Sequence, residues 1–248
     1  EDGAVSGDQY HEFLKNYSPY LNIEKPSFLS NLKFFFEYQI GYMYWRYLMW
    51  NFTGRQNDIQ GEYNVLNGNW ISGIPILDEL RLGNQSELPE DALNNKARNT
   101  YYFLPFILGL IGLYFIYQRD PKRFWVLLLF FLFTGLALKV YLNERPFEPR
   151  ERDYALVGSY YVFALWIGFG SWAIIQKLQT LISKKIAGPL AVGLCLVCVP
   201  LLMASQNWDD HDRSNRYTAQ SMAKSYLQSI QKDKGAIIFT IGDNDTFA

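Results

Sequence analysis

Apolar residues are concentrated in four segments of the chain, at about residues 100–117, 124–142, 155–176 and 186–204. Each segment is close to the roughly 20 residues that an α-helix needs to cross the hydrocarbon core of a bilayer. Polar stretches before, between and after the segments carry most of the charged residues. The pattern therefore predicts a mainly α membrane protein built on a bundle of four transmembrane helices.

The polar stretches divide the chain into an N-terminal region at 1–99, a transmembrane region at 100–204 and a C-terminal region at 205–248. Within the C-terminal region, apolar residues recur at spacings of three and four over 219–230, which predicts a helix. Residues 236–241 form an apolar run between two glycines and predict a buried strand. A helix followed by a strand predicts the start of an α/β domain.

Basic residues in the short loops predict the orientation in the membrane. The loop at 118–123 carries two arginines and a lysine, and the loop at 177–185 carries three lysines. Short loops with this bias face the cytoplasm. The regions at 1–99 and 205–248 are therefore predicted to be extracytoplasmic, together with the loop at 143–154.

An aromatic-rich segment at 34–50 precedes the spans and differs from them in its charges. Glu37 and Arg46 are nine positions apart, which places them on opposite sides of an α-helix. A lone span would then expose at least one charge to hydrocarbon, whereas tryptophan and tyrosine favour the headgroup level. We therefore expect this helix to lie along the outer membrane face as an anchor, without crossing the bilayer.

Lys139 is the only clear charge within the predicted spans, and it lies near the outer end of the second. Its long side chain predicts that the ammonium group reaches the headgroups, and contact with a lipid phosphate is the alternative. Transporters usually carry ionisable groups or broken helices near the middle of the bilayer, and these spans are otherwise apolar. A membrane transporter and a non-catalytic scaffold subunit stay as alternatives to an enzyme.

Net charge and the position of the cysteines argue against two further classes of function, nucleic-acid binding and redox chemistry. The formal net charge is -1 at pH 7, and no concentrated basic surface is evident, so we expect no nucleic acid partner. Cys195 and Cys198 have the C-x-x-C spacing of redox motifs, but they lie in an apolar segment, where a thiol has no soluble redox partner. We therefore expect no redox chemistry at this pair.

The loop at 143–154 is the first candidate site, because it concentrates charges at the predicted outer ends of two spans. Arginine donates two parallel hydrogen bonds to a phosphate, and a carboxylate can accept a proton from an acceptor hydroxyl. The alternative is that the charges pair among themselves and fix the two helix ends. The candidate phosphate-binding and acid–base residues in this loop are Arg145, Glu148, Arg150, Arg152 and Asp153.

A second candidate site lies at 51–62, where amide, guanidinium and carboxylate groups follow the aromatic segment. Such groups can hydrogen-bond a sugar or a pyrophosphate, and they can equally cap the preceding helix in solvent. On the first interpretation, Arg55, Asn57 and Asp58 help to close the pocket in which the loop at 143–154 binds a phosphate.

Two acidic stretches lie in the C-terminal region. His211 stands among aspartates and resembles a divalent-metal cluster, but adjacent residues rarely point at one ion, so a helix N-cap with solvated charge is the favoured interpretation. Asp243 and Asp245 follow the predicted strand, where open sheets bind ligands, or they form a turn that ends it. No cofactor is indicated, and a divalent cation stays open.

Several stretches in a fixed order also resemble a known family. They are Tyr44-Trp-Arg-Tyr through Trp50-Asn-Phe, Gly54-Arg-Gln-Asn-Asp, Arg145-Pro-Phe-Glu-Pro-Arg-Glu-Arg-Asp-Tyr, Asp209-Asp-His-Asp-Arg, and Ile241-Gly-Asp-Asn-Asp-Thr-Phe. The combination is similar to a large bacterial membrane family of unknown function that is related to the protein O-mannosyltransferases of the C-type glycosyltransferase superfamily.

The resemblance implies a multi-pass enzyme of the bacterial inner membrane with active-site loops and a C-terminal domain on the outer side. Such an enzyme moves a sugar from a polyprenyl-phosphate donor to a hydroxyl acceptor on a protein or a glycan, in contact with membrane lipids. The resemblance also implies an acidic catalytic residue in the first outer loop, which we expect upstream of this chain. We therefore expect the chain to be an internal fragment of that enzyme, inactive by itself.

Overall fold

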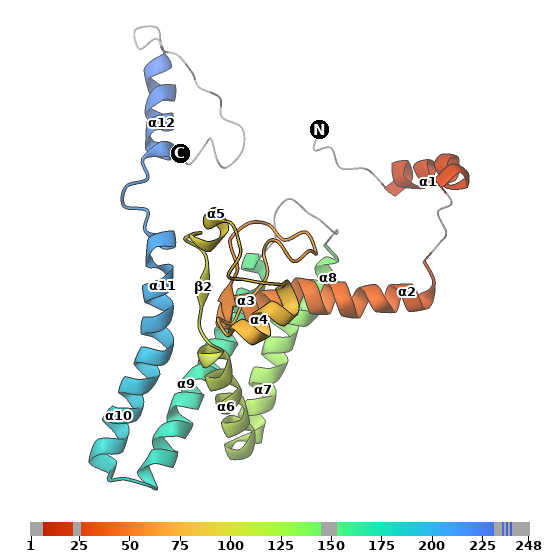
Figure 1. Cartoon of the computed structure of the whole chain (residues 1–248). Coiled ribbons are helices and arrows are strands. Elements are labelled where there is room, and N and C mark those ends of the chain that lie inside the picture. The colour runs from red at the N-terminus through yellow and green to blue at the C-terminus, as the bar shows by residue number, and fades with distance from the viewer. Residues whose placement is uncertain are drawn as a thin grey trace.

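The computed structural model describes residues 7–21, 26–144 and 153–230, together with residues 235, 237 and 239. The described chain is mostly helical, as the sequence predicts, and it contains one two-stranded sheet. In Figure 1 the long helices lie side by side, one helix crosses them near one end, and irregular segments cover that end. The loop residues 145–152 and the predicted strand at 236–241 lie outside the described ranges, apart from residues 237 and 239.

Within the described residues, three helices are long and apolar enough to cross a membrane: Pro121–Leu142, Tyr154–Gln179 and Lys184–His211. The chain is therefore consistent with a multi-pass membrane protein. The helical parts that form them are α7 (Pro121–Leu132), η2 (Phe133–Ala137) and α8 (Leu138–Leu142), then η3 (Asp153–Leu156) and α9 (Val157–Gln179), then α10 (Lys184–Leu196), η4 (Val197–Leu201) and α11 (Leu202–His211).

The first predicted span corresponds to a shorter apolar helix, α6 (Leu104–Arg119), of 16 residues. It begins later than predicted because Asn99–Thr100 forms the strand β2, and the chain then turns at Tyr102 and Phe103, whose φ angles are 53° and 59°. Pro105 in the first turn suits a helix start, where its missing N–H costs nothing. The sequence pattern thus located this helix but not its beginning.

A helix formed by α2 (Phe28–Lys33), η1 (Phe34–Arg46) and α3 (Tyr47–Phe52) runs across the bundle in Figure 1. Glu37 at its outer part is exposed, whereas Arg46 is buried and donates a hydrogen bond from Nε to the carbonyl of Tyr42 at 3.1 Å. Its position along a membrane face stays a prediction. A further helix, α1 (Gly7–Leu21), precedes it in the chain.

The crossing helix joins the bundle through an aromatic core. Tyr44, Phe52, Phe131, Phe163 and Trp166 are all buried in it. The Phe52 and Phe163 ring centroids lie 4.4 Å apart, and those of Phe131 and Trp166 lie 4.8 Å apart. The Tyr44 hydroxyl is hydrogen-bonded to the Ser159 hydroxyl at 2.6 Å, which satisfies both buried groups. This core fixes the end of α3 against α7 and α9.

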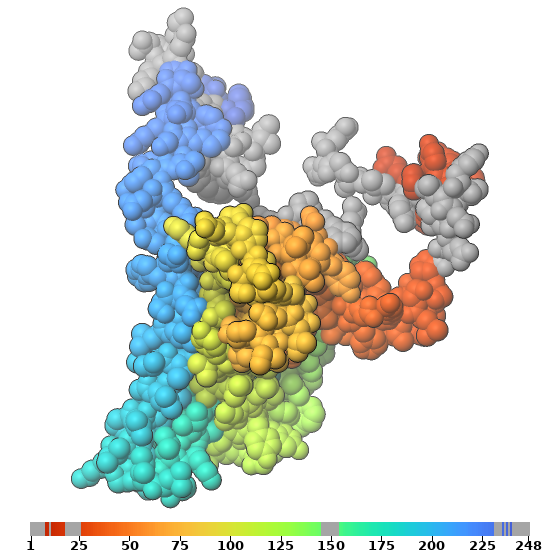
Figure 2. All heavy atoms as spheres, in the orientation of Figure 1, coloured from red at the N-terminus to blue at the C-terminus, as the bar shows by residue number. Residues whose placement is uncertain are grey.

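A cap of short elements covers the end of the bundle beside the crossing helix. The strands β1 (Gly54–Arg55) and β2 pair antiparallel, with Gly54 opposite Thr100 and Arg55 opposite Asn99. Gly54 has a φ of 142°, and a Cβ there would lie 2.4 Å from the Asn99 carbonyl oxygen, so only glycine fits. The helices α4 (Pro75–Leu82) and α5 (Glu90–Leu93) complete the cap, which Figure 2 shows in orange and yellow beside the blue α10–α11 column.

The helix α12 (Thr218–Ser229) confirms the helix predicted over 219–230. The rest of the predicted C-terminal α/β domain, with Asp243 and Asp245, lies outside the described residues.

Candidate functional site

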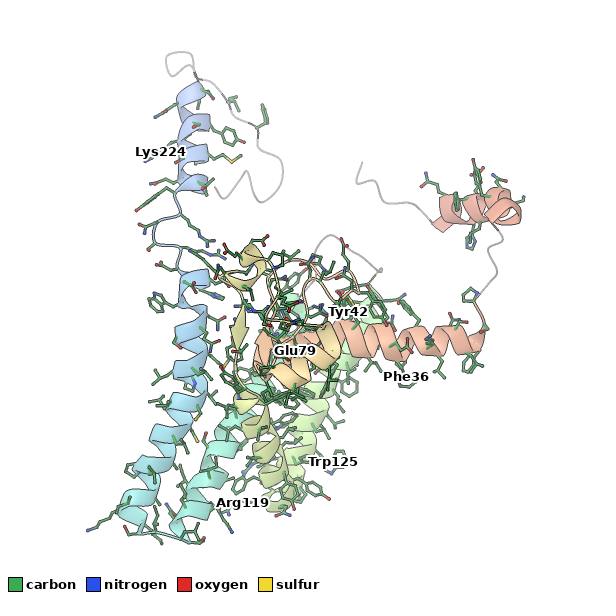
Figure 3. The ribbon with its side chains drawn as sticks, viewed as in Figure 1. Phe36, Tyr42, Glu79, Arg119, Trp125 and Lys224 are labelled. Atoms are coloured by element: carbon green, nitrogen blue, oxygen red, sulfur yellow. The ribbon has the colours of Figure 1, made fainter. Side chains whose placement is uncertain are left out.

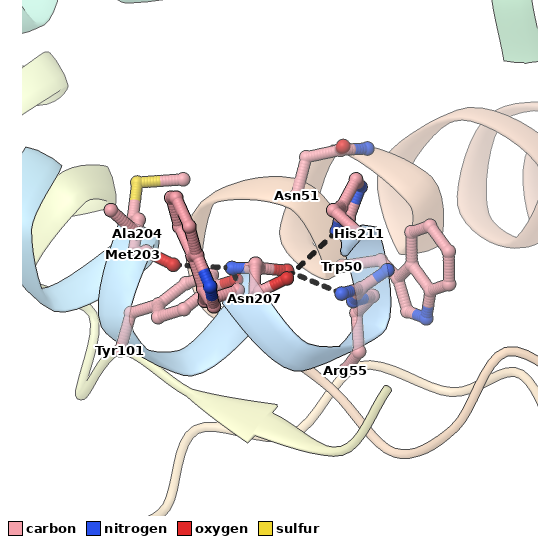
Figure 4. A pocket seen from close by; sticks show the side chains of 9 residues that line it. Trp50, Asn51, Arg55, Tyr101, Met203, Ala204, Asn207 and His211 are labelled. Atoms are coloured by element: carbon pink, nitrogen blue, oxygen red, sulfur yellow. Dashed lines mark hydrogen bonds between the residues drawn. The ribbon is translucent and has the colours of Figure 1, made fainter. Parts of the chain in front are cut away.

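A cavity of about 410 Å³ lies where α11 meets α3 and β1, at the capped end of the bundle (Figure 4). Aromatic rings, amides, a guanidinium and an imidazole share its walls. The lining residues are Trp50, Asn51, Arg55, Tyr101, Met203, Ala204, Asn207, Trp208 and His211.

Three separate parts of the chain supply these residues. Trp50 and Asn51 stand at the end of α3, Arg55 belongs to β1, and Tyr101 follows β2 directly. The residues from α11 recur at spacings of three and four, so they share one face of that helix. The cavity therefore depends on docking of α11 against the cap.

The amide side chains of Gln206 and Asn207 bind α11 to the cap through hydrogen bonds. Gln206 forms two hydrogen bonds with the backbone of Thr100 in β2. The Thr100 N–H donates to Gln206 Oε1 at 2.7 Å, and Gln206 Nε2 donates to the Thr100 carbonyl at 2.9 Å. Asn207 Nδ2 donates to the Tyr101 hydroxyl at 2.6 Å, and Asn207 Oδ1 accepts from Asn99 Nδ2 at 3.1 Å. Both amides are satisfied on both of their groups, which makes the contact specific in register.

Arg55 is held at the cavity wall by three contacts. Its Nη2 donates to Asp210 Oδ2 at 3.2 Å and to Asn207 Oδ1, and its guanidinium carbon lies 5.0 Å from the centre of the Trp50 ring. The side chains of Arg55 and Asp210 are only 11% and 21% exposed. A partly buried pair of this kind fixes a guanidinium in place, so its remaining donors are presented to the cavity in a defined direction.

Tyr101 supplies a neutral hydroxyl to the same network. Burial raises the pKa of Tyr101 above its ordinary value of 10.0, while the hydrogen bond from Asn207 and the charge of Arg55 lower it less. The hydroxyl is therefore protonated at neutral pH and able to donate as well as to accept.

His211 lines the cavity from the last residue of α11, which corrects the expectation of a helix N-cap. The helix of the last apolar segment continues unbroken to His211 and ends where Asp212 becomes extended. His211 Nδ1 lies 3.0 Å from the Asn207 carbonyl oxygen and 3.6 Å from Asp210 Oδ2. Across the ranges that the structure describes, no group of three His, Cys, Asp or Glu side chains could hold a metal ion.

The structure separates the three residues predicted at 51–62. Arg55 lines the cavity, but Asn57 is buried in the cap, where its Oδ1 accepts from Gly68 N–H at 2.9 Å. Asp58 is exposed and accepts a long hydrogen bond of 3.5 Å from Asn95. Of the three, only Arg55 lines this cavity, because successive loop residues point in different directions. The expectation that all three help to close the pocket of the loop at 143–154 stays a prediction, since residues 145–152 lie outside the described ranges.

The other predicted site residues remain untested by the described ranges. Asp153 is the first residue of η3. Outside the described residues lie Arg145, Glu148, Arg150, Arg152, Asp243 and Asp245.

The position of the Lys139 side chain differs from the prediction that its ammonium group reaches the headgroups. Its side chain is 5% exposed and pairs with the carboxylate of Glu144, which is 3% exposed. Among the residues that the structure describes, none is hydrogen-bonded to the Oε1 atom of Glu144. Because a carboxylate lies five residues further on, beyond the end of α8, the ammonium group is neutralised inside the protein.

Sequence reasoning missed most of the cavity, namely Trp50, Tyr101, Asn207 and Trp208 as site residues. A signal was present in the spacing of Met203, Ala204, Asn207, Trp208 and His211, which is that of one helical face. The apolar pattern predicts that the last span ends at residue 204, and it therefore does not predict that the helix continues to His211 with a polar, aromatic face.

Together these features are consistent with a multi-pass membrane protein that has an aromatic and polar cavity at one end of its apolar helices. Residues 219–248, which begin within α12, match the family model described as TMEM260-associated domain 2. Comparison with curated proteins and with solved structures gives no match.

Proposed function

We propose that the chain is part of a membrane glycosyltransferase that moves a sugar from a polyprenyl-phosphate donor to a hydroxyl acceptor, on a protein, at the outer face of a bacterial inner membrane. The observation that carries the proposal is the cavity between α3, β1 and α11, because its lining has the chemistry that sugars require.

A sugar ring presents C–H groups on its faces and hydroxyl groups around its edge. Trp50, Tyr101 and Trp208 offer aromatic surface to the faces, while the Asn51 amide and the Tyr101 hydroxyl offer hydrogen bonds to the sugar hydroxyls. The volume of about 410 Å³ lies within the range of about 300–1,000 Å³ that is usual for small-molecule sites. The cavity therefore suits a sugar better than an apolar ligand or an inorganic ion.

A lipid-linked sugar also carries a phosphate at headgroup depth. Among the described residues, the Arg55 side chain donates to Asp210 and Asn207 through Nη2, which leaves Nη1 and Nε as donors for such a phosphate. The proposal assigns a second phosphate contact to the loop at 143–154, through Arg145, Arg150 or Arg152. Cationic donors stabilise the charge that develops as a phosphate departs.

The proposed topology places the cavity outside the cell. The α6–α7 and α9–α10 junctions share the end of the bundle opposite the cap in Figure 1, and both carry basic residues. Such loops face the cytoplasm, so the cap, the cavity and the C-terminal region take the outer side. In this proposal α6 also crosses the membrane, as a fourth span in addition to the three longer helices, and it is shortened because β2 precedes it. Residues 205–248 begin an α/β domain.

The match of residues 219–248 supports the same class of function, because TMEM260 is an O-mannosyltransferase-like protein. The sequence resemblance to protein O-mannosyltransferases rests mainly on residues between 44 and 213, and one of its stretches, at 241–247, lies inside the matched segment. The two similarities therefore overlap in part.

Transfer of sugar by the full-length enzyme from an extracted polyprenyl-linked donor tests the proposal. Trp208→Ala removes one aromatic wall and should lower kcat/KM by roughly 5- to 10-fold, since such a contact is worth about 1 kcal/mol. Trp125→Ala is the matched control, because Trp125 is also exposed but lies near the opposite end of the bundle (Figure 3). It should change kcat/KM by less than about twofold.

The outcomes separate the hypotheses. No transfer by the unaltered full-length protein would contradict the enzyme proposal and favour a transporter or a scaffold. Transfer that is unaffected by Trp208→Ala would leave an enzyme whose sugar site is not this cavity.

A further inference from the structure

A second cavity, of about 230 Å³, lies at the other end of the bundle, where α6 ends and α7 begins against α9. Figure 3 shows Arg119 at this end, far from the cap. The cavity has no residue in common with the one between α3, β1 and α11.

The lining of this second cavity changes from apolar to charged along the helix axes. Phe115, Phe169 and Trp172 line the part that is nearer the middle of the bundle. Arg119 and Arg123 stand at the rim with Asp120 between them, at the junction of α6 and α7. A ligand that fits both parts has an apolar portion and an anionic portion.

The rim carries one net positive charge, because two guanidinium groups face one carboxylate. Arg123 pairs with Asp120 at 3.0 Å, but its side chain is 80% exposed, and pairs so exposed contribute little stability. Among the described residues, Arg119 makes a long hydrogen bond, of 3.5 Å, to Gln176 Oε1, and its guanidinium carbon lies 5.9 Å from the centre of the Phe115 ring. Both guanidinium groups are therefore able to turn toward a ligand, and the net charge complements a phosphodiester.

The position along the helices specifies the kind of phosphodiester. The candidate span Pro121–Leu142 begins at the rim, and the span Tyr154–Gln179 ends beside it. The rim thus lies at the level where a bilayer has its headgroups, and the apolar part lies at the level of the acyl chains. Trp172 is 53% exposed on this surface. An aromatic ring at this level can contact both the headgroups and the acyl chains of the lipid.

We propose that this cavity binds the phosphodiester headgroup of an anionic membrane phospholipid. Arg119 and Arg123 contact the phosphate, and Trp172 contacts the part of the acyl chains that is next to the headgroup. The inference needs only the membrane spans and is independent of sugar transfer.

Native mass spectrometry of the full chain, extracted from bilayers that mix phosphatidylcholine with phosphatidylglycerol, measures the preference for the anionic lipid. The variant Arg119→Gln/Arg123→Gln should lose about 10- to 30-fold of that preference, as expected when two charge-assisted contacts with the headgroup phosphate are removed. The control Lys184→Gln/Lys185→Gln removes the same charge from the same end, at residues that do not line the cavity. It should keep the preference within about twofold.

Equal losses in the two variants would show general attraction by a basic surface and would overturn the proposal. Displacement of the lipid by inorganic phosphate at similar concentration would overturn it as well, since the site would then bind a free anion. If the arginine variant does not fold, the variant Trp172→Ala tests the proposal instead, because it leaves the charged residues at the rim unchanged. Retention of both lipids should then fall several-fold, and unchanged retention would contradict the proposal.

Discussion

A single buried charge, Lys139, shows what decides the fate of an ionisable residue in an apolar helix. The residue lies in the candidate span Pro121–Leu142, where an isolated ammonium group would be costly. Its partner Glu144 lies just beyond the end of α8, and both side chains are almost completely buried. The pair therefore joins the end of one span to the start of the loop at 143–154.

Removing one partner should destabilise the protein more than removing both. Lys139→Met leaves a buried carboxylate without a counter-ion and should lower the free energy of unfolding by about 3–5 kcal/mol. Lys139→Met/Glu144→Leu should recover most of that loss. The measurement is thermal or denaturant unfolding of the purified protein in detergent.

Lys33 and Glu37 provide the matched control for that experiment, because they form an exposed pair at 3.9 Å. Lys33→Met should cost less than about 1 kcal/mol. A loss in Lys139→Met that is no larger than the loss in Lys33→Met would mean that Lys139 reaches water in the membrane.

Residue types in the sequence indicated polar chemistry after the aromatic segment, but they could not give side-chain direction. Arg55 faces the cavity because β1 pairs with β2, whereas Asn57, two residues later, turns inward to accept from Gly68 N–H. Both orientations depend on contacts with residues far along the chain. Periodicity contains no information on those contacts.

Among the elements, α6 and α9 depend most on small residues for their packing. A Cβ at Gly112 would lie 1.7 Å from the Trp166 carbonyl oxygen, and one at Gly170 would lie 2.1 Å from the Leu108 carbonyl oxygen. Helices approach this closely in membranes only where side chains are absent. Close packing of α6 against α9 therefore requires glycine at both of these positions.

Gly112→Ala should therefore separate α6 from α9 and lower the melting temperature in detergent. The cost is that of overpacking, about 1–3 kcal/mol. Gly168→Ala is the control, because nothing lies within 4 Å of a Cβ at that position of α9. It should leave stability unchanged or raise it by about 0.5–1 kcal/mol through helix propensity. Equal melting temperatures for both variants would show that α6 and α9 are not in close contact.

Helix positions were predictable from apolar periodicity, whereas helix ends were not. The segments near 124–142 and 155–176 correspond closely to described helices, since length and hydropathy are local properties. The start of α6 is set by pairing between β1 and β2, and the end of α11 by side-chain contacts of Gln206 and Asn207 with the cap. Both are tertiary effects.

On the scale of the whole molecule, the cavity exists because three distant segments meet at one end of the bundle. Trp50, Tyr101 and Trp208 are separated by about fifty and about one hundred residues, and the crossing helix, β2 and α11 bring them together. No local pattern predicts such a meeting. The resemblance between sequences pointed to the class of function, and the fold adds a place where that function would be carried out.

The most direct test of the central claim is a cryo-electron microscopy structure of the full-length protein with a polyprenyl-phosphate sugar added. The account predicts sugar density between Trp50 and Trp208, with the phosphate within hydrogen-bond distance of Arg55. Sugar density elsewhere, with the cavity of α3, β1 and α11 filled only by solvent, would contradict the account.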